Sequence, residues 1–141
     1  MTHQVSAEDR QFRADFEAGR LSPEAFDHRG HIRLAYAYLA EADPESALTS
    51  LRSALQSFLR HQGIPASKYH ETLTRAWILA VRHFMETSSP AASANEFIDR
   101  NPGLLDSRIM MTHYSTDLLF SQEARARFIE PNLDPIPRYD P

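Results

Sequence analysis

The spacing of apolar residues constrains this chain more than any other feature of its sequence. Between residues 47 and 59, apolar side chains recur every three or four positions, which is the period of a helix with one buried face. Alternation with a period of two is nearly absent, and the chain contains only four glycines. Strands therefore have little support, and we predict an all-α protein.

Capping residues place the ends of the expected helices. Asp43 and Pro44 form a helix start before the apolar run, and Gly63 follows its end, as expected for an N-cap, a first helical position and a C-terminal glycine. Ser67 is the expected cap of the helix that contains Trp77. The sequence predicts about six or seven helices, at residues 7–18, 27–41, 43–62, 68–87, 94–100, 107–114 and 121–129.

The length of the chain favours one folding unit. A chain of 141 residues can bury about two thirds of its unfolded surface around one core. We expect a single compact domain at residues 1–130. Residues 131–141 contain four prolines, which cannot continue a helix, so we expect an extended or polyproline-like tail there.

Composition excludes several classes of function. Fifteen basic and nineteen acidic residues give a net charge of −4, and the basic residues form no dense stripe. We therefore expect no nucleic-acid partner. The absence of cysteine excludes disulfides and iron–sulfur clusters, and no pattern indicates a nucleotide or haem. Without an apolar leader or spanning segment, we expect a cytoplasmic protein with no membrane partner. A homo-oligomer is compatible with the sequence.

Histidines at two expected helix starts are the best candidates for a site. His28 and His31 are three residues apart and so share one helix face. His70 and Glu71 open another helix, where the macrodipole favours neutral imidazole, the form that binds metals and accepts protons. We predict one divalent metal, Zn, Fe or Cu, held by His28, His31 and His70, with Glu71 as fourth ligand or general base.

Other polar residues flank these histidines and are candidate contacts for a small-molecule ligand. Arg29 and Arg33 suit a carboxylate or phosphate, although salt bridges to acidic neighbours are the more common role of such residues. The remaining candidates for contact with the ligand are Tyr69, His113 and Tyr114.

Three functions remain open. The first is a metal-dependent enzyme with hydrolytic or oxidative chemistry. The second is a metal-independent enzyme in which His70 and Glu71 act as an acid–base pair and Arg29 or Arg33 holds an anionic substrate. The third is a module that binds a small molecule or a protein without catalysis. Neither the HExxH pattern of metalloproteases nor the ExxH pairs of di-iron bundles occurs in the chain.

Four segments carry a resemblance to other proteins. They are FDHRGHIRLAYAYL, KYHETLTRAW, NPGLLD and SQEARARFIEPNLDPIP. Together they resemble an uncharacterised group of small bacterial all-helical proteins over about residues 21–137. The resemblance implies that His28, His31, His70 and Glu71 belong to a shared pattern, and it implies no activity, cofactor or substrate.

Overall fold

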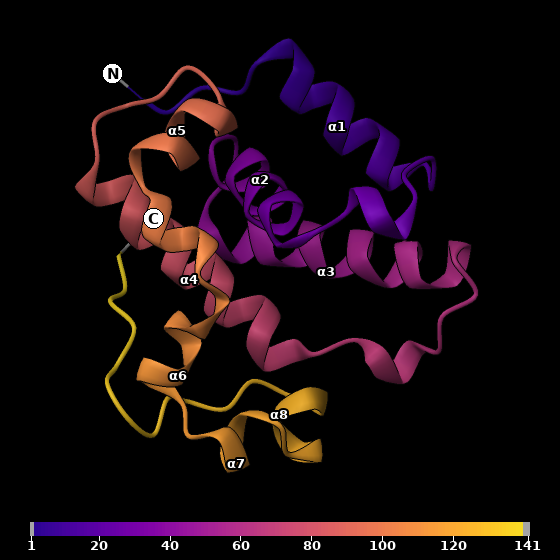
Figure 1. Ribbon diagram of the computed structural model, residues 1–141, viewed down its shortest axis with the longest axis vertical. Coiled ribbons are helices and arrows are strands. Elements are labelled where there is room, and N and C mark those ends of the chain that lie inside the picture. Colours follow the sequence, from indigo (N-terminus) through magenta and orange to yellow (C-terminus); the bar gives the residue numbers. More distant parts are fainter. Residues whose placement is uncertain (1, 140–141) are drawn as a thin grey trace.

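The computed structural model describes residues 2–139, which form an all-helical fold without strands (Figure 1). None of the helices in this range is long and apolar enough to cross a membrane. The eight α-helices of the described residues are α1 (Ala7–Glu17), α2 (His28–Leu39), α3 (Pro44–His61), α4 (Glu71–Thr87), α5 (Ala94–Arg100), α6 (Met110–His113), α7 (Thr116–Leu119) and α8 (Gln122–Ala126).

Local capping sets most of the helix ends as the sequence predicts. Ser6 and Asp9 form a reciprocal capping box at the start of α1, and the Asp43 side chain accepts a hydrogen bond from the Ser46 N–H at the start of α3. Gly63, just after α3, has a φ of 67°, a left-handed conformation that glycine adopts without steric cost. The expected α1 and α3 helices are therefore confirmed to within about one residue.

The start of α4 differs from the prediction. Ser67 lies in a short 3-10 turn, η2 (Ala66–Lys68), and does not cap the following helix. The cap is His70, whose Nδ1 accepts a hydrogen bond from the Leu73 N–H at 3.1 Å. The prediction of Ser67 was wrong because Tyr69 and His70 adopt extended backbone conformations, so the helix begins three residues later than expected.

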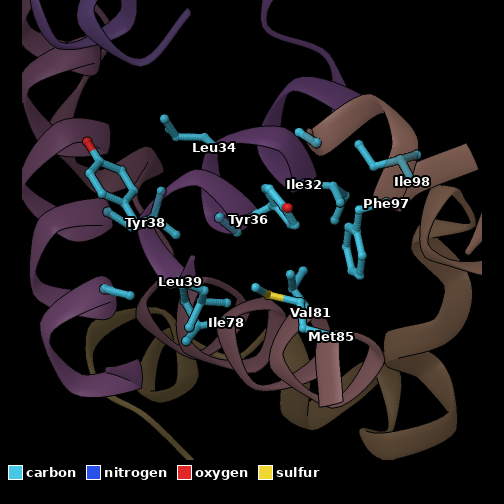
Figure 2. Packing of buried hydrophobic residues seen from close by; sticks show 14 of the residues in the cluster. Ile32, Leu34, Tyr36, Tyr38, Leu39, Ile78, Val81, Met85, Phe97 and Ile98 are labelled. Atoms are coloured by element: carbon cyan, nitrogen blue, oxygen red, sulfur yellow. The ribbon is translucent and has the colours of Figure 1, made fainter. Parts of the chain in front are cut away.

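The main hydrophobic core lies between α2, α3, α4 and α5 (Figure 2). Helix α2 is central, since six of its consecutive residues from Leu34 to Leu39 are buried. Tyr36 stacks on Phe97 of α5 with ring centroids 4.9 Å apart, and its hydroxyl donates to the Gln4 carbonyl at 2.7 Å. Burial on all sides explains why α2 carries an almost continuous apolar run.

A second apolar cluster covers the other side of α4. The short helices α6 and α7 pack there, and α8 contacts α4 and α7 at the same end of the molecule, opposite α1 (Figure 1). Ile136, from the proline-rich segment, is buried in the same cluster. The Leu133 N–H donates to the His113 carbonyl at 2.9 Å, so residues 131–139 lie against the body without forming a helix or strand. Pro141 lies outside the described residues.

Candidate ligand-binding cavity

A cavity of about 640 Å³ lies where the two apolar clusters meet. Its walls come from α2, α3, α4 and the segment from Ser107 to Phe120. Trp77 packs against both clusters and lines the cavity. The volume falls within the range of about 300 to 1,000 Å³ that is usual for small-molecule sites.

Apolar side chains dominate the lining of the cavity. Phe26, Phe58 and Trp77 supply aromatic surface, and leucines of α3 supply aliphatic surface. The polar groups are few and include the three histidines that the sequence singled out. His28, His31 and His70 all line this one cavity, although 39 positions of sequence separate His31 from His70.

His31 offers its ring to the cavity without a protein partner. The ring packs on Phe26, with centroids 4.0 Å apart, and forms no hydrogen bond with any residue among 2–139. It is accessible because it faces the cavity. Partial desolvation by the surrounding walls, with repulsion from His28, lowers the pKa of His31 from 6.5 to about 4. The ring is therefore neutral at pH 7.

His70 also lines the cavity, but both of its ring nitrogens are engaged. Nδ1 accepts from the Leu73 N–H, and Nε2 lies 2.7 Å from the Leu119 carbonyl, to which it must donate. Burial is the main cause that lowers the pKa of His70. The structure therefore fixes one neutral tautomer, and neither nitrogen is available to a metal or a substrate in this conformation.

His28 is partly engaged. Its Nε2 lies 2.9 Å from the Leu104 carbonyl, and its ring meets Trp77 edge-on with centroids 4.9 Å apart. Within residues 2–139, no three histidine, aspartate or glutamate side chains are close enough to hold a metal ion. The structure thus brings the three predicted ligands to one cavity but does not arrange them around a common point.

Glu71 lies outside this cavity. It lines a second, more open hollow of about 730 Å³ together with Arg52 and Tyr69. Arg52 donates two hydrogen bonds to the Glu71 carboxylate, from Nε at 2.9 Å and from Nη2 at 2.6 Å. The Tyr69 hydroxyl donates a third to the same carboxylate at 2.6 Å. Burial favours the protonated acid, but these hydrogen bonds outweigh it and lower the pKa of Glu71. Glu71 is an ionised partner of Arg52 here and makes no hydrogen bond to His70.

Four of the five predicted ligand contacts lie elsewhere. Arg29 bonds to Asp99 at 3.2 Å on the exposed side of α2, and Arg33 bonds to the buried Asp9 at 3.0 Å. His113 Nδ1 lies 2.7 Å from the Asp134 carbonyl, and the Tyr114 hydroxyl donates to the Ile129 carbonyl at 2.6 Å. Of the five, Tyr69 alone lines the cavity.

Several lining residues did not emerge from the sequence as site residues. Trp77 was expected on the buried side of its helix, a pattern that does not distinguish a core position from a cavity wall. Lys68, Arg108, Met110 and Phe120 lie on turns and short helices, whose position relative to α2 and α3 depends on the tertiary fold. No local signal identifies them.

Comparisons of the chain with protein-family models, with curated proteins and with solved structures find no match. The resemblance drawn from the four sequence segments therefore stays a prediction.

Proposed function

We propose that the chain binds a small, largely apolar molecule in the cavity and pairs one polar group of that molecule with His31. One observation carries this proposal. A neutral imidazole without a hydrogen-bond partner among the described residues faces an apolar cavity of about 640 Å³. Because the His31 ring is exposed to the cavity, its nitrogens are accessible to a ligand hydroxyl or carbonyl, which would supply a hydrogen-bond partner.

The chemistry of the lining supports this class of ligand. Aromatic and aliphatic walls favour an apolar body, and a few polar groups fix its orientation. Neutral His31 carries one donor and one acceptor nitrogen, so it can pair with either a carbonyl or a hydroxyl. A cationic ligand would lose hydration against the apolar walls without gaining an ionic partner, because no carboxylate of residues 2–139 lines the cavity.

The low basicity of His31 favours binding over acid–base catalysis. A general base acts best when its pKa is near the working pH, whereas the pKa of His31 is about 4. The other base that the sequence suggested, His70, donates and accepts within the protein. We therefore place the non-catalytic binding function ahead of a metal-independent acid–base enzyme.

Equilibrium dialysis with naphthol and naphthalene tests the proposal. The two probes share an aromatic body, and only naphthol carries a hydroxyl. We expect naphthol to bind more tightly by roughly three- to tenfold, the value of one net hydrogen bond. In His31→Leu, this preference should disappear while naphthalene still binds. No binding of either probe to the parent protein would contradict the proposal.

A second pair of variants tests whether the cavity holds the probe. Leu55 lines the cavity, so Leu55→Phe should reduce its volume and weaken both probes. Leu79→Phe is the matched control, because Leu79 packs in the second cluster and does not line the cavity. Equal loss of binding in the two variants would indicate a general effect on the fold and would contradict the placement.

A metal-dependent enzyme is the second candidate, favoured by the convergence of His28, His31 and His70 on one cavity. Binding of Zn, Fe or Cu by all three would require His70 to release Leu119 or Leu73. Elemental analysis of untagged protein tests this function. About one metal per chain, lost in both His28→Ala and His70→Ala, would support it. A metal content that neither variant changes would contradict it.

The cytoplasmic location, the lack of a nucleic-acid partner and a possible homo-oligomer stay predictions.

A further inference from the structure

The hollow that contains Glu71 is a cationic groove. We define it by Arg52, Arg75, Arg125, Arg127, Glu71 and Tyr69, which line it between α3, α4 and α8. Four arginines and a single glutamate thus line a hollow of about 730 Å³. This concentration of positive charge is unexpected on a chain with a net charge of −4.

One of the four arginines has a fixed structural role. Arg52 holds Glu71 through two hydrogen bonds, and the Glu71 side chain is only 13% exposed. Paired, bidentate geometry of this kind is strong and directional. The Arg52–Glu71 pair, with the Tyr69 hydroxyl bonded to it, forms a rigid floor and leaves the remaining charge of the groove to the other three arginines.

Two further arginines are paired with exposed carboxylates. Arg75 lies 3.0 Å from Glu45, whose side chain is 73% exposed. Arg127 pairs with Glu123, which lies one turn earlier in the chain and is also exposed. Water and salt screen such pairs, so they stabilise the protein little. Both guanidinium groups are therefore able to exchange these partners for a ligand at low cost.

The fourth arginine has no ionic partner. Arg125 lines the groove and is partly buried, yet its guanidinium group forms no hydrogen bond or salt bridge within residues 2–139. In contrast, the other three arginines of the groove each have a carboxylate partner.

The Phe128 ring restricts the position of the Arg75 side chain. Its guanidinium lies over the Phe128 ring at 4.8 Å from the centroid, a cation–π contact that holds the group over an apolar face. Such stacking leaves the edge of the guanidinium free to donate hydrogen bonds. Arg75 is thus held in place at the groove by a contact that a bound anion would not have to break.

We propose that this groove binds a small-molecule oxyanion, a phosphate ion or phosphate monoester, through Arg75, Arg125 and Arg127. Planar guanidinium groups match the spacing of phosphate oxygens and bind them through charge-assisted hydrogen bonds. The unpaired Arg125 together with two exchangeable arginines supplies the charge. This site is distinct from the apolar cavity, and the proposal does not depend on what the cavity binds.

Isothermal titration of the whole chain with inorganic phosphate and with phenyl phosphate tests the proposal at low ionic strength. We expect saturable binding of at least one of them that weakens as salt is added. Binding of both probes would point to a phosphate monoester as the natural ligand, and binding of inorganic phosphate alone to the free ion. Arg125→Ala should weaken binding by about tenfold or more, since it removes charge-assisted hydrogen bonds, and Arg75→Ala should weaken it in the same direction.

Arg20→Ala is the matched control. Arg20 pairs with Asp15 on an exposed surface outside the groove, so its loss changes the net charge equally and should leave phosphate affinity unchanged. Arg125→Gln provides a second test at the same position if the alanine variant folds poorly. The proposal would be overturned by the absence of saturable phosphate binding, by equal weakening in Arg20→Ala, or by binding to anionic lipid vesicles alone.

Discussion

The His70 ring connects the start of α4 to the end of α7, because its Nε2 donates to the Leu119 carbonyl at 2.7 Å. The same ring caps α4 by accepting the Leu73 N–H on Nδ1. A residue that the sequence marks as a candidate base and metal ligand therefore has a structural role. It joins α4 to the short helices that form one wall of the cavity.

Replacing His70 tests this structural role. His70→Ala should lower the free energy of unfolding by roughly 2 to 4 kcal/mol, because it removes an N-cap and leaves the Leu119 carbonyl without its donor. Urea denaturation measures the change. His61→Ala is the control, since His61 is exposed and its side chain makes no hydrogen bond within the described residues. A similar loss in both variants would contradict the role of His70.

Asp9 makes a second prediction, about acid stability. Its carboxylate is almost fully buried and accepts hydrogen bonds from the Ala94 N–H, the Ser6 N–H and Arg33. Burial alone would raise the pKa of Asp9, but these bonds outweigh it and lower the pKa below 3.8. Because the folded state favours the ionised form, this contribution to stability is complete above about pH 4 and is lost as the pH falls further.

Asp9→Asn should therefore destabilise the protein at pH 7 by roughly 2 to 4 kcal/mol, as expected when a buried ion pair loses one partner. It should also flatten the fall in stability below pH 4. Urea denaturation between pH 2 and pH 7 measures both effects. Asp117→Asn is a suitable control, because Asp117 is exposed and its side chain makes no hydrogen bond or ion pair within residues 2–139. An equally steep acid limb in Asp9→Asn would contradict the assignment.

His31 predicts a separate pH dependence. Its pKa is about 4 in the folded protein against 6.5 for an ordinary histidine, so the unfolded chain binds more protons between these values. Stability should consequently fall as the pH is lowered from about 6.5 towards 4. His31→Gln should reduce this slope, and an NMR titration of the His31 ring should give a midpoint near pH 4. A midpoint above 6 would contradict the lowered pKa of His31.

Tyr114 tests how the C-terminal segment is held. The Tyr114 side chain is fully buried, and its hydroxyl donates to the Ile129 carbonyl at 2.6 Å. Tyr114→Phe keeps the ring and leaves this carbonyl without a donor, which should cost about 1 to 2 kcal/mol. Hydrogen exchange of the amides of residues 129–139 should also become faster. Unchanged exchange would show that other contacts hold the segment.

Local sequence signals account for the helices whose ends they determine. Asp43, Pro44 and Gly63 act through their own backbones and near neighbours, so the bounds of α3 follow from sequence. The start of α4 does not, because the cap at His70 is supported by the Leu119 carbonyl, 49 positions away. Helices α6 to α8 are likewise too short to form alone. Helices α6 and α7 pack in the second apolar cluster, and α8 packs against α4 and α7.

In the candidate site, too, some features follow from local sequence and others depend on contacts between helices. His28 and His31 share a cavity because their spacing places them on one face of α2, and His70 reaches it from the start of α4. Glu71 points elsewhere because it is the first residue of α4, whereas His70 precedes it as the N-cap with an extended backbone. The partners of Arg33 and Arg52 are Asp9 and Glu71, which come from the neighbouring helices α1 and α4. Sequence spacing cannot identify such pairs.

The most direct test of a ligand in the cavity uses methionine methyl groups. Met110 and Met111 line the cavity, whereas Met85 is buried in the main core and does not. We would titrate protein carrying ¹³C-labelled methionine methyl groups with naphthol and record the NMR signals. The account predicts saturable shifts of the Met110 and Met111 signals with Met85 unchanged. Unchanged signals for all three, or a shift of Met85 alone, would contradict it.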